Sequence, residues 1–161
     1  MTPESTAAPR AVAASDAPAE RRTLGRTAAW LAKQVEIGLG TVELSLPQYR
    51  VLGLLDERSA VSSDLAARLA VRPPTVTSVV DGLVARGLVG RHPVAGDRRR
   101  VDHRLTPEGL AVLGAADAAV EARLREVTDA MADPVATEEA FEGLAHWRRA
   151  LVAYSRARWG R

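Results

Sequence analysis

The stretch that decides the fold runs from Val71 to Thr106, VRPPTVTSVVDGLVARGLVGRHPVAGDRRRVDHRLT. Its first part predicts a helix from Pro73 to Arg86, and the glycine that follows is typical of a helix end. The remainder has apolar residues at period two on both sides of an arginine-rich turn, which predicts two half-buried strands. A helix slim enough for the major groove of DNA, followed by a cationic hairpin, is the winged helix-turn-helix arrangement. The stretch therefore predicts contact with double-stranded DNA.

A shorter helix precedes this one and completes the motif. Residues 62–70, SSDLAARLA, have the apolar spacing of a helix, and Val71 and Arg72 leave room only for a tight turn. The spacing within the longer helix predicts a buried face made of Val76, Val79, Val80 and Leu83. It predicts an outward face made of Pro74, Thr77, Ser78 and Asp81. The outward face is the surface that can enter a DNA groove.

The positive charge of the chain is concentrated in one segment. The 161 residues include 22 basic and 20 acidic side chains, so the net charge is only +2. Between Arg86 and Arg104, however, six arginines stand against two acids. A local excess of cations on a nearly neutral protein suits contact with phosphate. For the arginines at 98–100 the alternative is a solvated hairpin tip, and Arg91 and Arg104 could equally serve only to cover the sheet.

Helices are expected on both sides of the motif. Residues 1–20 show no periodicity and predict a disordered tail. A first helix is predicted over residues 23–42, where apolar residues recur at helical spacing. A second begins at Ser45, because Ser45, Pro47 and Gln48 have the pattern of a capping box with proline in the first turn.

The C-terminal third also predicts helices. Thr106 followed by proline begins one that reaches about Met131, and Thr137 is expected to cap the last one after a break at Asp133 and Pro134. These flanking helices carry more apolar surface than one small core requires, which indicates a homodimer. The expected fold is mainly α with a small β-wing. A single domain is expected over 21–161, with the winged helix-turn-helix lobe at 45–106 and dimerisation helices at 21–44 and 107–160.

Several classes of protein are not expected from this composition. The chain has no cysteine, which excludes disulfides and thiolate metal sites. No apolar run approaches the ~20 residues that cross a membrane, and no signal-peptide pattern is present, so we expect a cytoplasmic protein. His92 and His146 have no neighbour at ligand spacing, so no metal site is expected. Without a nucleophile turn or a glycine-rich phosphate loop, no catalytic residue or cofactor is expected either.

Three segments carry a resemblance to a known family. They are LSLPQYRVLGLL from Leu44, SDLAARLAVRPPTVTSVVDGLVARGLV from Ser63 and DRRRVDHRLTPEG from Asp97. Over residues 45–113 the sequence resembles the multiple antibiotic resistance regulator (MarR) family of dimeric winged-helix transcription factors. The resemblance implies a regulator, most often a repressor, that binds an inverted-repeat operator. It also implies a small aromatic or phenolic acid as effector, bound between the dimer helices and the lobe.

The resemblance also assigns roles to individual residues. Arg99 matches the wing arginine that enters the minor groove, and Asp97 matches the aspartate that holds the wing through an ion pair. Thr75, Thr77 and Ser78 match the front of the recognition helix. The residues expected to contact DNA are Arg72, Thr75, Thr77, Ser78, Arg98, Arg99 and Arg100.

Three positions depart from the family pattern. Arg72 stands where a serine cap is usual, so the helix loses a cap and gains a cation that can reach phosphate or a base edge. Ser78 and Gly82 each replace a frequent arginine, and the glycine costs the helix roughly 1 kcal/mol relative to alanine. Binding is therefore expected to depend on the wing more than is usual.

Other residues admit two interpretations. His103 occupies an inward strand position, which predicts a hydrogen-bonded core histidine, with a pH or ligand sensor as the alternative. Trp30, Tyr49, Phe141 and Trp147 lie on helices that surround the effector cleft in the family, but aromatic residues at helical spacing are usually core or interface. For the whole chain, the alternatives are a protein-interaction adaptor that never contacts DNA, and an enzyme acting on a small aromatic compound.

Overall fold

The computed structural model describes residues 23–94 and 97–159, and side chains at 97–99, 156 and 159 are outside the description. The predicted tail, residues 1–20, and the turn residues Ala95 and Gly96 therefore lie outside the described residues. The chain divides into two units, residues 1–32 and residues 33–161. The described part of the first unit is the beginning of helix α1 (Leu24–Gly40), and the second unit holds the rest of α1 and all other elements.

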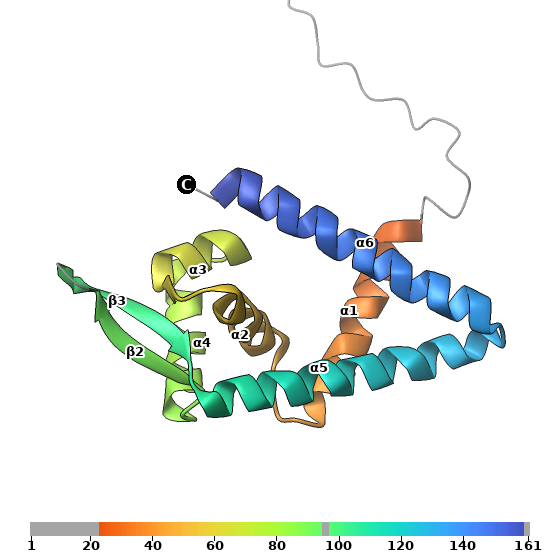
Figure 1. The fold of residues 1–161 in the computed structure, drawn as a ribbon, viewed down its shortest axis with the longest axis horizontal. Helices are drawn as coiled ribbons and strands as arrows, with labels where there is room; N and C mark the ends of the chain where they lie inside the picture. The colour runs from red at the N-terminus through yellow and green to blue at the C-terminus, as the bar shows by residue number, and fades with distance from the viewer. Residues whose placement is uncertain (1–22, 95–96, 160–161) are drawn as a thin grey trace, which may run out of the picture. The chain divides into compact units, whose positions relative to one another are not determined.

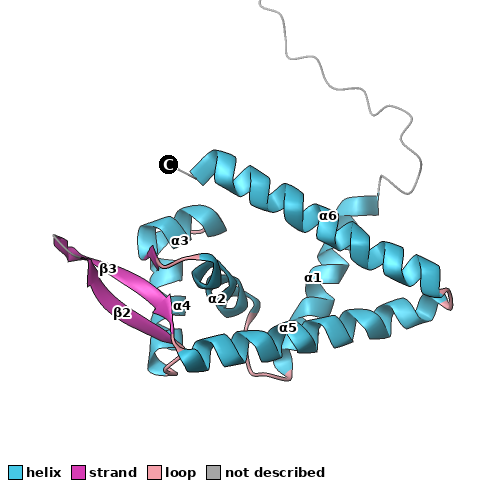
Figure 2. Cartoon of the chain, in the orientation of Figure 1, coloured by secondary structure: helices cyan, strands magenta, loops and turns pink. Residues whose placement is uncertain are grey.

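The second unit is mainly helical with one small sheet (Figures 1 and 2). After α1 the elements are α2 (Leu46–Glu57), β1 (Ala60–Val61), α3 (Ser62–Leu69), α4 (Pro73–Ala85), β2 (Val89–Val94), β3 (Asp97–Leu105), α5 (Pro107–Thr128), the 3-10 turn η2 (Asp129–Met131) and α6 (Pro134–Trp159). This arrangement confirms the predicted fold class. None of the helices in the described residues is long and apolar enough to span a lipid bilayer.

The sheet has three antiparallel strands in the order β1-β3-β2, one more than the sequence predicted. The additional strand, β1, consists of two residues directly before α3, too few to show a period-two pattern. It places Ala60 opposite His103, and His103 also lies opposite Arg91 on β2. β3 is therefore the central strand, and its backbone is paired on both sides at His103.

Two of the three predicted helix caps are confirmed. Gln48 N donates to Ser45 Oγ at 3.4 Å and Ser45 N donates to Gln48 Oε1 at 2.9 Å, which completes the capping box of α2. Thr106 Oγ1 accepts from Gly109 N at 3.0 Å at the start of α5.

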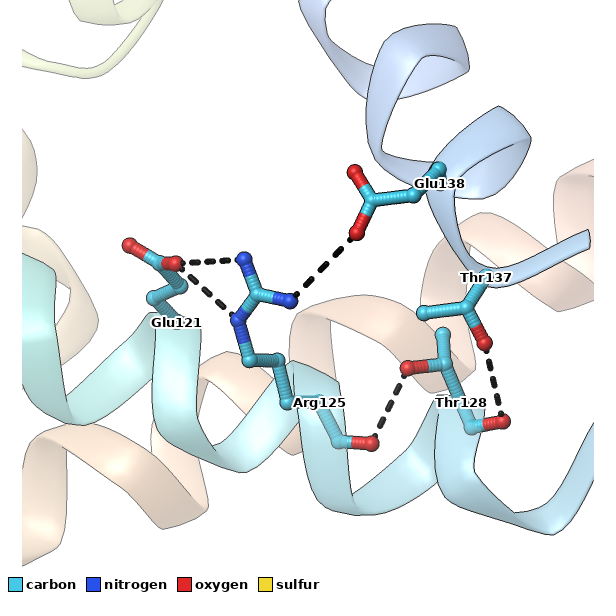
Figure 3. Close-up of polar contacts among 5 residues, drawn as sticks. All are labelled: Glu121, Arg125, Thr128, Thr137 and Glu138. Carbon is cyan, nitrogen blue, oxygen red and sulfur yellow. Dashed lines mark hydrogen bonds and ion pairs between the residues drawn. The ribbon is translucent and has the colours of Figure 1, made fainter. Parts of the chain in front are cut away.

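The predicted cap at Thr137 is wrong, because α6 begins three residues earlier, at Pro134. Asp133 Oδ1 accepts from Val135 N at 2.9 Å and from Ala136 N at 3.4 Å, so an aspartate directly before proline starts this helix. Thr137 lies inside the helix, and its hydroxyl donates to the carbonyl of Thr128 across the α5–α6 turn (Figure 3).

The core lies where α2, α3 and α4 pack against the sheet and α5. The largest fully buried side chains are Leu39, Val51, Leu52, Leu65, Val76, Val80 and Leu83. Several apolar side chains of α5 and α6 remain exposed in the single chain, namely Leu110, Val127, Val135, Leu144, Trp147 and Leu151. Apolar surface on two long helices outside the core agrees with the predicted subunit interface, which stays a prediction.

A close backbone contact joins the lobe to α5. A Cβ at Gly109 would lie 2.0 Å from the carbonyl oxygen of Leu88, so only glycine fits there. That carbonyl accepts from Thr106 N at 3.2 Å, and Thr106 Oγ1 donates to Gly87 O at 2.8 Å. The beginning of α5 is thus bonded directly to the turn between α4 and β2.

Candidate nucleic-acid interface

The helix expected to enter DNA, α4, has one buried and one exposed face. Val76, Val80 and Leu83 are buried, Val79 is half-buried, and Pro74, Thr77, Ser78 and Asp81 are exposed, which confirms the predicted division. Thr75 is exposed as well. The hydroxyl of Thr77 donates to Pro73 O at 3.1 Å, so it would have to change partner, or act as an acceptor, to bond a base.

The turn before α4 is as tight as the sequence predicts. Ala70 has left-handed dihedral angles, φ 55° and ψ 41°, and Val71 N donates to Ala66 O at 3.1 Å. Arg72 follows as the N-cap residue of α4, and its side chain makes no cap hydrogen bond. The exposed Arg72 side chain lies at the end of the helix that, in helix-turn-helix proteins, contacts base edges.

The wing is formed by β2 and β3, which extend beyond α3 and α4 (Figure 2). Arg100 is exposed on β3. For Asp97, Arg98 and Arg99 the structure gives the backbone, which is part of β3, but their side chains lie outside the description. The predicted ion pair of Asp97 and the predicted contacts of Arg98 and Arg99 therefore stay predictions.

Two strand arginines form ion pairs that the sequence did not predict. Arg91 on β2 contacts Asp81 on α4, and Arg104 contacts Asp102 on the same strand at 3.2 Å. The first pair joins the recognition helix to the wing, and its partners are ten residues apart in sequence. No local pattern marks such a pair, because it depends on how a strand folds back along a helix.

His103 is the buried histidine that the sequence predicted. It is 4% exposed, and its Nε2 lies 2.9 Å from Ser62 Oγ, which confirms the hydrogen-bonded core interpretation. Its Nδ1 is buried without a hydrogen-bond partner. Burial, and next the positive charge of Arg91, lower the pKa of His103 below its ordinary value.

A cleft of about 1280 Å³ lies within the second unit, bordered by α2, α3, α5 and α6. Its lining residues include the aromatic side chains Tyr49 and Trp147 and the cations Arg50 and Arg148. Tyr49 donates to Asp117 Oδ1 at 2.5 Å, and burial, with this carboxylate, raises the pKa of the phenol.

Phe141 and Trp30 are not among the residues that line this cleft. Phe141 packs against Arg125, whose guanidinium lies 4.7 Å from the ring centroid, and Trp30 belongs to the first unit. Within residues 23–94 and 97–159, no three His, Asp or Glu side chains gather as a metal site.

Several known proteins are similar to this chain in sequence and in fold. Residues 43–100 match the model of the MarR family. The HTH-type transcriptional regulator PecS of Dickeya dadantii is 30% identical over 95 residues, which are 56% of this chain and 57% of PecS, so the match spans little more than half of that relative. Wild-type MarR from E. coli in its apo form is 25% identical with a TM-score of 0.68, over 81% of this chain and 98% of MarR. The Mycobacterium tuberculosis MarR family protein RV2887, in complex with salicylic acid, is 28% identical with a TM-score of 0.64, over 83% and 98% of the two chains.

Proposed function

We propose that this chain, whose residues 43–100 match the model of the MarR family, is a winged-helix transcriptional regulator that binds an inverted-repeat operator as a homodimer and represses transcription. The observation that carries the proposal is the two-faced helix α4. Its apolar face is buried in the lobe, while Thr75, Thr77 and Ser78 are exposed on a helix that a major groove admits.

In this proposal the two parts of the motif have separate roles. Thr75, Thr77 and Ser78 contact base edges or neighbouring phosphates, and Arg72 reaches a phosphate or a guanine edge beside them. Arg98, Arg99 and Arg100 hold the adjacent minor groove or backbone, with Asp97 keeping the wing in place. The wing then supplies most of the cationic contact, because α4 contains no lysine or arginine.

Dimerisation is proposed through the helices at 21–44 and 107–160. The exposed apolar side chains of α5 and α6 include Val127, Trp147 and Leu151, and such surfaces mark protein interfaces. A two-fold dimer would place both recognition helices on one face of the DNA. The half-sites should then be about 10 base pairs apart or a multiple of that spacing.

The cleft lined by Tyr49 and Trp147 is the proposed effector site. Its aromatic side chains suit an aromatic ring, and Arg50 and Arg148 supply cations for a carboxylate. The salicylic acid bound by RV2887, a relative 28% identical, supports an effector of this class. The effector would lower DNA affinity only if it binds one conformation of the dimer more tightly than the other.

Selection of duplexes from a random DNA pool tests the proposal. We expect a palindromic consensus, with two protomers bound to each duplex as measured by light scattering of the complex. Addition of salicylate at increasing concentration should then release the recovered duplex. Failure to enrich any sequence, with binding no stronger than that of an unrelated neutral protein, would refute a DNA-binding role and favour the protein-interaction adaptor.

A further inference from the structure

The recognition helix has an unusual charge for a surface that meets DNA. Between Pro73 and Ala85 it contains no lysine or arginine, and its one ionisable residue is Asp81. Asp81 lies one helical turn after Thr77 and Ser78, on the same exposed face. A carboxylate there would repel the phosphates on either side of the groove unless a cation accompanied it.

Arg91 is that cation. Its Nη2 contacts Asp81 Oδ1, and the two side chains are 49% and 54% exposed, so solvent or a ligand can reach both. The contact with Asp81 uses Nη2 of the Arg91 guanidinium, which is a planar group with five N–H donors. The backbone of Arg91 is held as well, because Arg91 pairs with His103 on the central strand.

The position along α4 indicates which part of DNA the pair would meet. In helix-turn-helix complexes the N-terminal residues of the recognition helix contact base edges. Asp81 lies in the third turn, beyond those residues, and Arg91 approaches it from the wing. In a complex of that geometry, a group between the recognition helix and the wing would face the sugar-phosphate backbone between the major groove and the minor groove.

We propose that Arg91 binds a DNA phosphate at this boundary and that Asp81 is a positioning residue that holds its guanidinium there. The inference rests on the proposed DNA-binding function. The proposed contact gives α4, which has no lysine or arginine of its own, a neighbouring cation that comes from β2 and not from the arginines at 98–100. The competing explanation is that the ion pair of Arg91 and Asp81 only joins α4 to β2 and makes no contact with DNA.

The variant Asp81→Asn separates the two explanations. If the pair only joins the helix to the strand, removing a negative charge from a surface that faces DNA raises affinity for every duplex. If Asp81 positions Arg91, affinity for the duplex recovered by selection falls even though the protein gains one positive charge. Affinity for a random duplex of equal length should fall less, because nonspecific binding does not need one fixed geometry.

Arg91→Ala tests the phosphate contact through its salt dependence. Loss of one contact should reduce the slope of log K against log salt by about 0.9. Between 50 and 200 mM salt, the wild-type protein should therefore lose about 3.5-fold more affinity than the variant. The double variant Asp81→Asn with Arg91→Ala should bind the duplex more tightly than Arg91→Ala alone. In the single variant the Asp81 carboxylate has lost its paired cation and repels the phosphates, and in the double variant this carboxylate is absent.

Arg104→Ala is the matched control. Arg104 is also a strand arginine paired with an aspartate, but it lines a shallow pocket together with Leu55 of α2 and Leu110 of α5, and not with any residue of α4. Its salt slope should equal that of the wild type, and thermal unfolding should show that all variants are folded. Failure of the wild-type protein to bind any duplex would refute the proposed function itself. A wild-type protein that binds, with an unchanged slope for Arg91→Ala or tighter binding by Asp81→Asn, would overturn only the role given to this pair.

Discussion

Replacing Gly109 by alanine should destabilise the protein, although alanine is the better helix former. The new Cβ would lie 2.0 Å from Leu88 O, about 1.4 Å short of the 3.4 Å at which ordinary contact begins. Because that oxygen belongs to the backbone and accepts from Thr106 N, the strain cannot be relieved by a rotamer change. Overpacking costs about 1–3 kcal/mol or more, and loss of a hydrogen bond about 1 kcal/mol, against about 1 kcal/mol returned by helix propensity. We expect a net loss of about 1–3 kcal/mol in the free energy of unfolding.

Urea denaturation followed by circular dichroism, at one fixed protein concentration, measures this loss. The matched control is Gly114→Ala in the same helix, where the added methyl group would meet no atom within 4 Å. That variant should gain about 1 kcal/mol, so the two alanine variants should differ by about 2–4 kcal/mol. A Gly109→Ala protein whose midpoint equals or exceeds that of the wild type would refute the argument from close backbone contact.

Three further predictions concern ionisable residues. Arg99→Ala should reduce the salt slope of DNA binding by about 0.9 without changing the unfolding temperature, and an unchanged affinity for the selected duplex would show that Arg99 makes no contact with DNA. Arg72→Ser should raise the free energy of unfolding by about 1 kcal/mol, because α4 lacks a side-chain cap, and should weaken DNA binding; equal affinity would mean that Arg72 only projects into solvent. Because the pKa of His103 is lowered in the folded state, the unfolded chain binds more protons in mildly acidic solution, so stability should decrease as pH falls below about 6.5. In His103→Asn this part of the pH dependence should be absent when unfolding is measured from pH 8 to pH 5, and an unchanged profile would assign it to other groups.

Features encoded by neighbouring residues could be predicted from the sequence. The capping box at Ser45 and the buried face of α4 depend on spacings of three and four residues, which a sequence shows directly. The observed start of α6 differs from the predicted one because Asp133 and Thr137 are both good cap residues, and the proline after Asp133 decides between them.

Features that join distant segments could not be predicted. The contact of Arg91 with Asp81 requires the hairpin to fold back along α4, and the bond between Tyr49 and Asp117 joins residues 68 positions apart. Neither contact leaves a periodic pattern, because each depends on the tertiary arrangement of two elements. The strand β1 could not be predicted for the same reason, since its two residues form a strand only because they pair with β3.

The bonded contact at the start of α5 determines how the lobe can move. Thr106 holds the carbonyls of Gly87 and Leu88, and Gly109 brings the two backbones into direct contact, so this connection does not behave as a flexible linker. A rotation of α5 would therefore carry the end of α4 and the beginning of β2 with it as one rigid piece. In a dimer built on α5, a change of a few degrees at the helix would produce a displacement that grows with distance from the axis of rotation, and β2 and β3 extend away from the start of α5 (Figure 1). The separation of two DNA-reading surfaces would then be set by the angle between two helices, and a ligand could alter it without touching either surface.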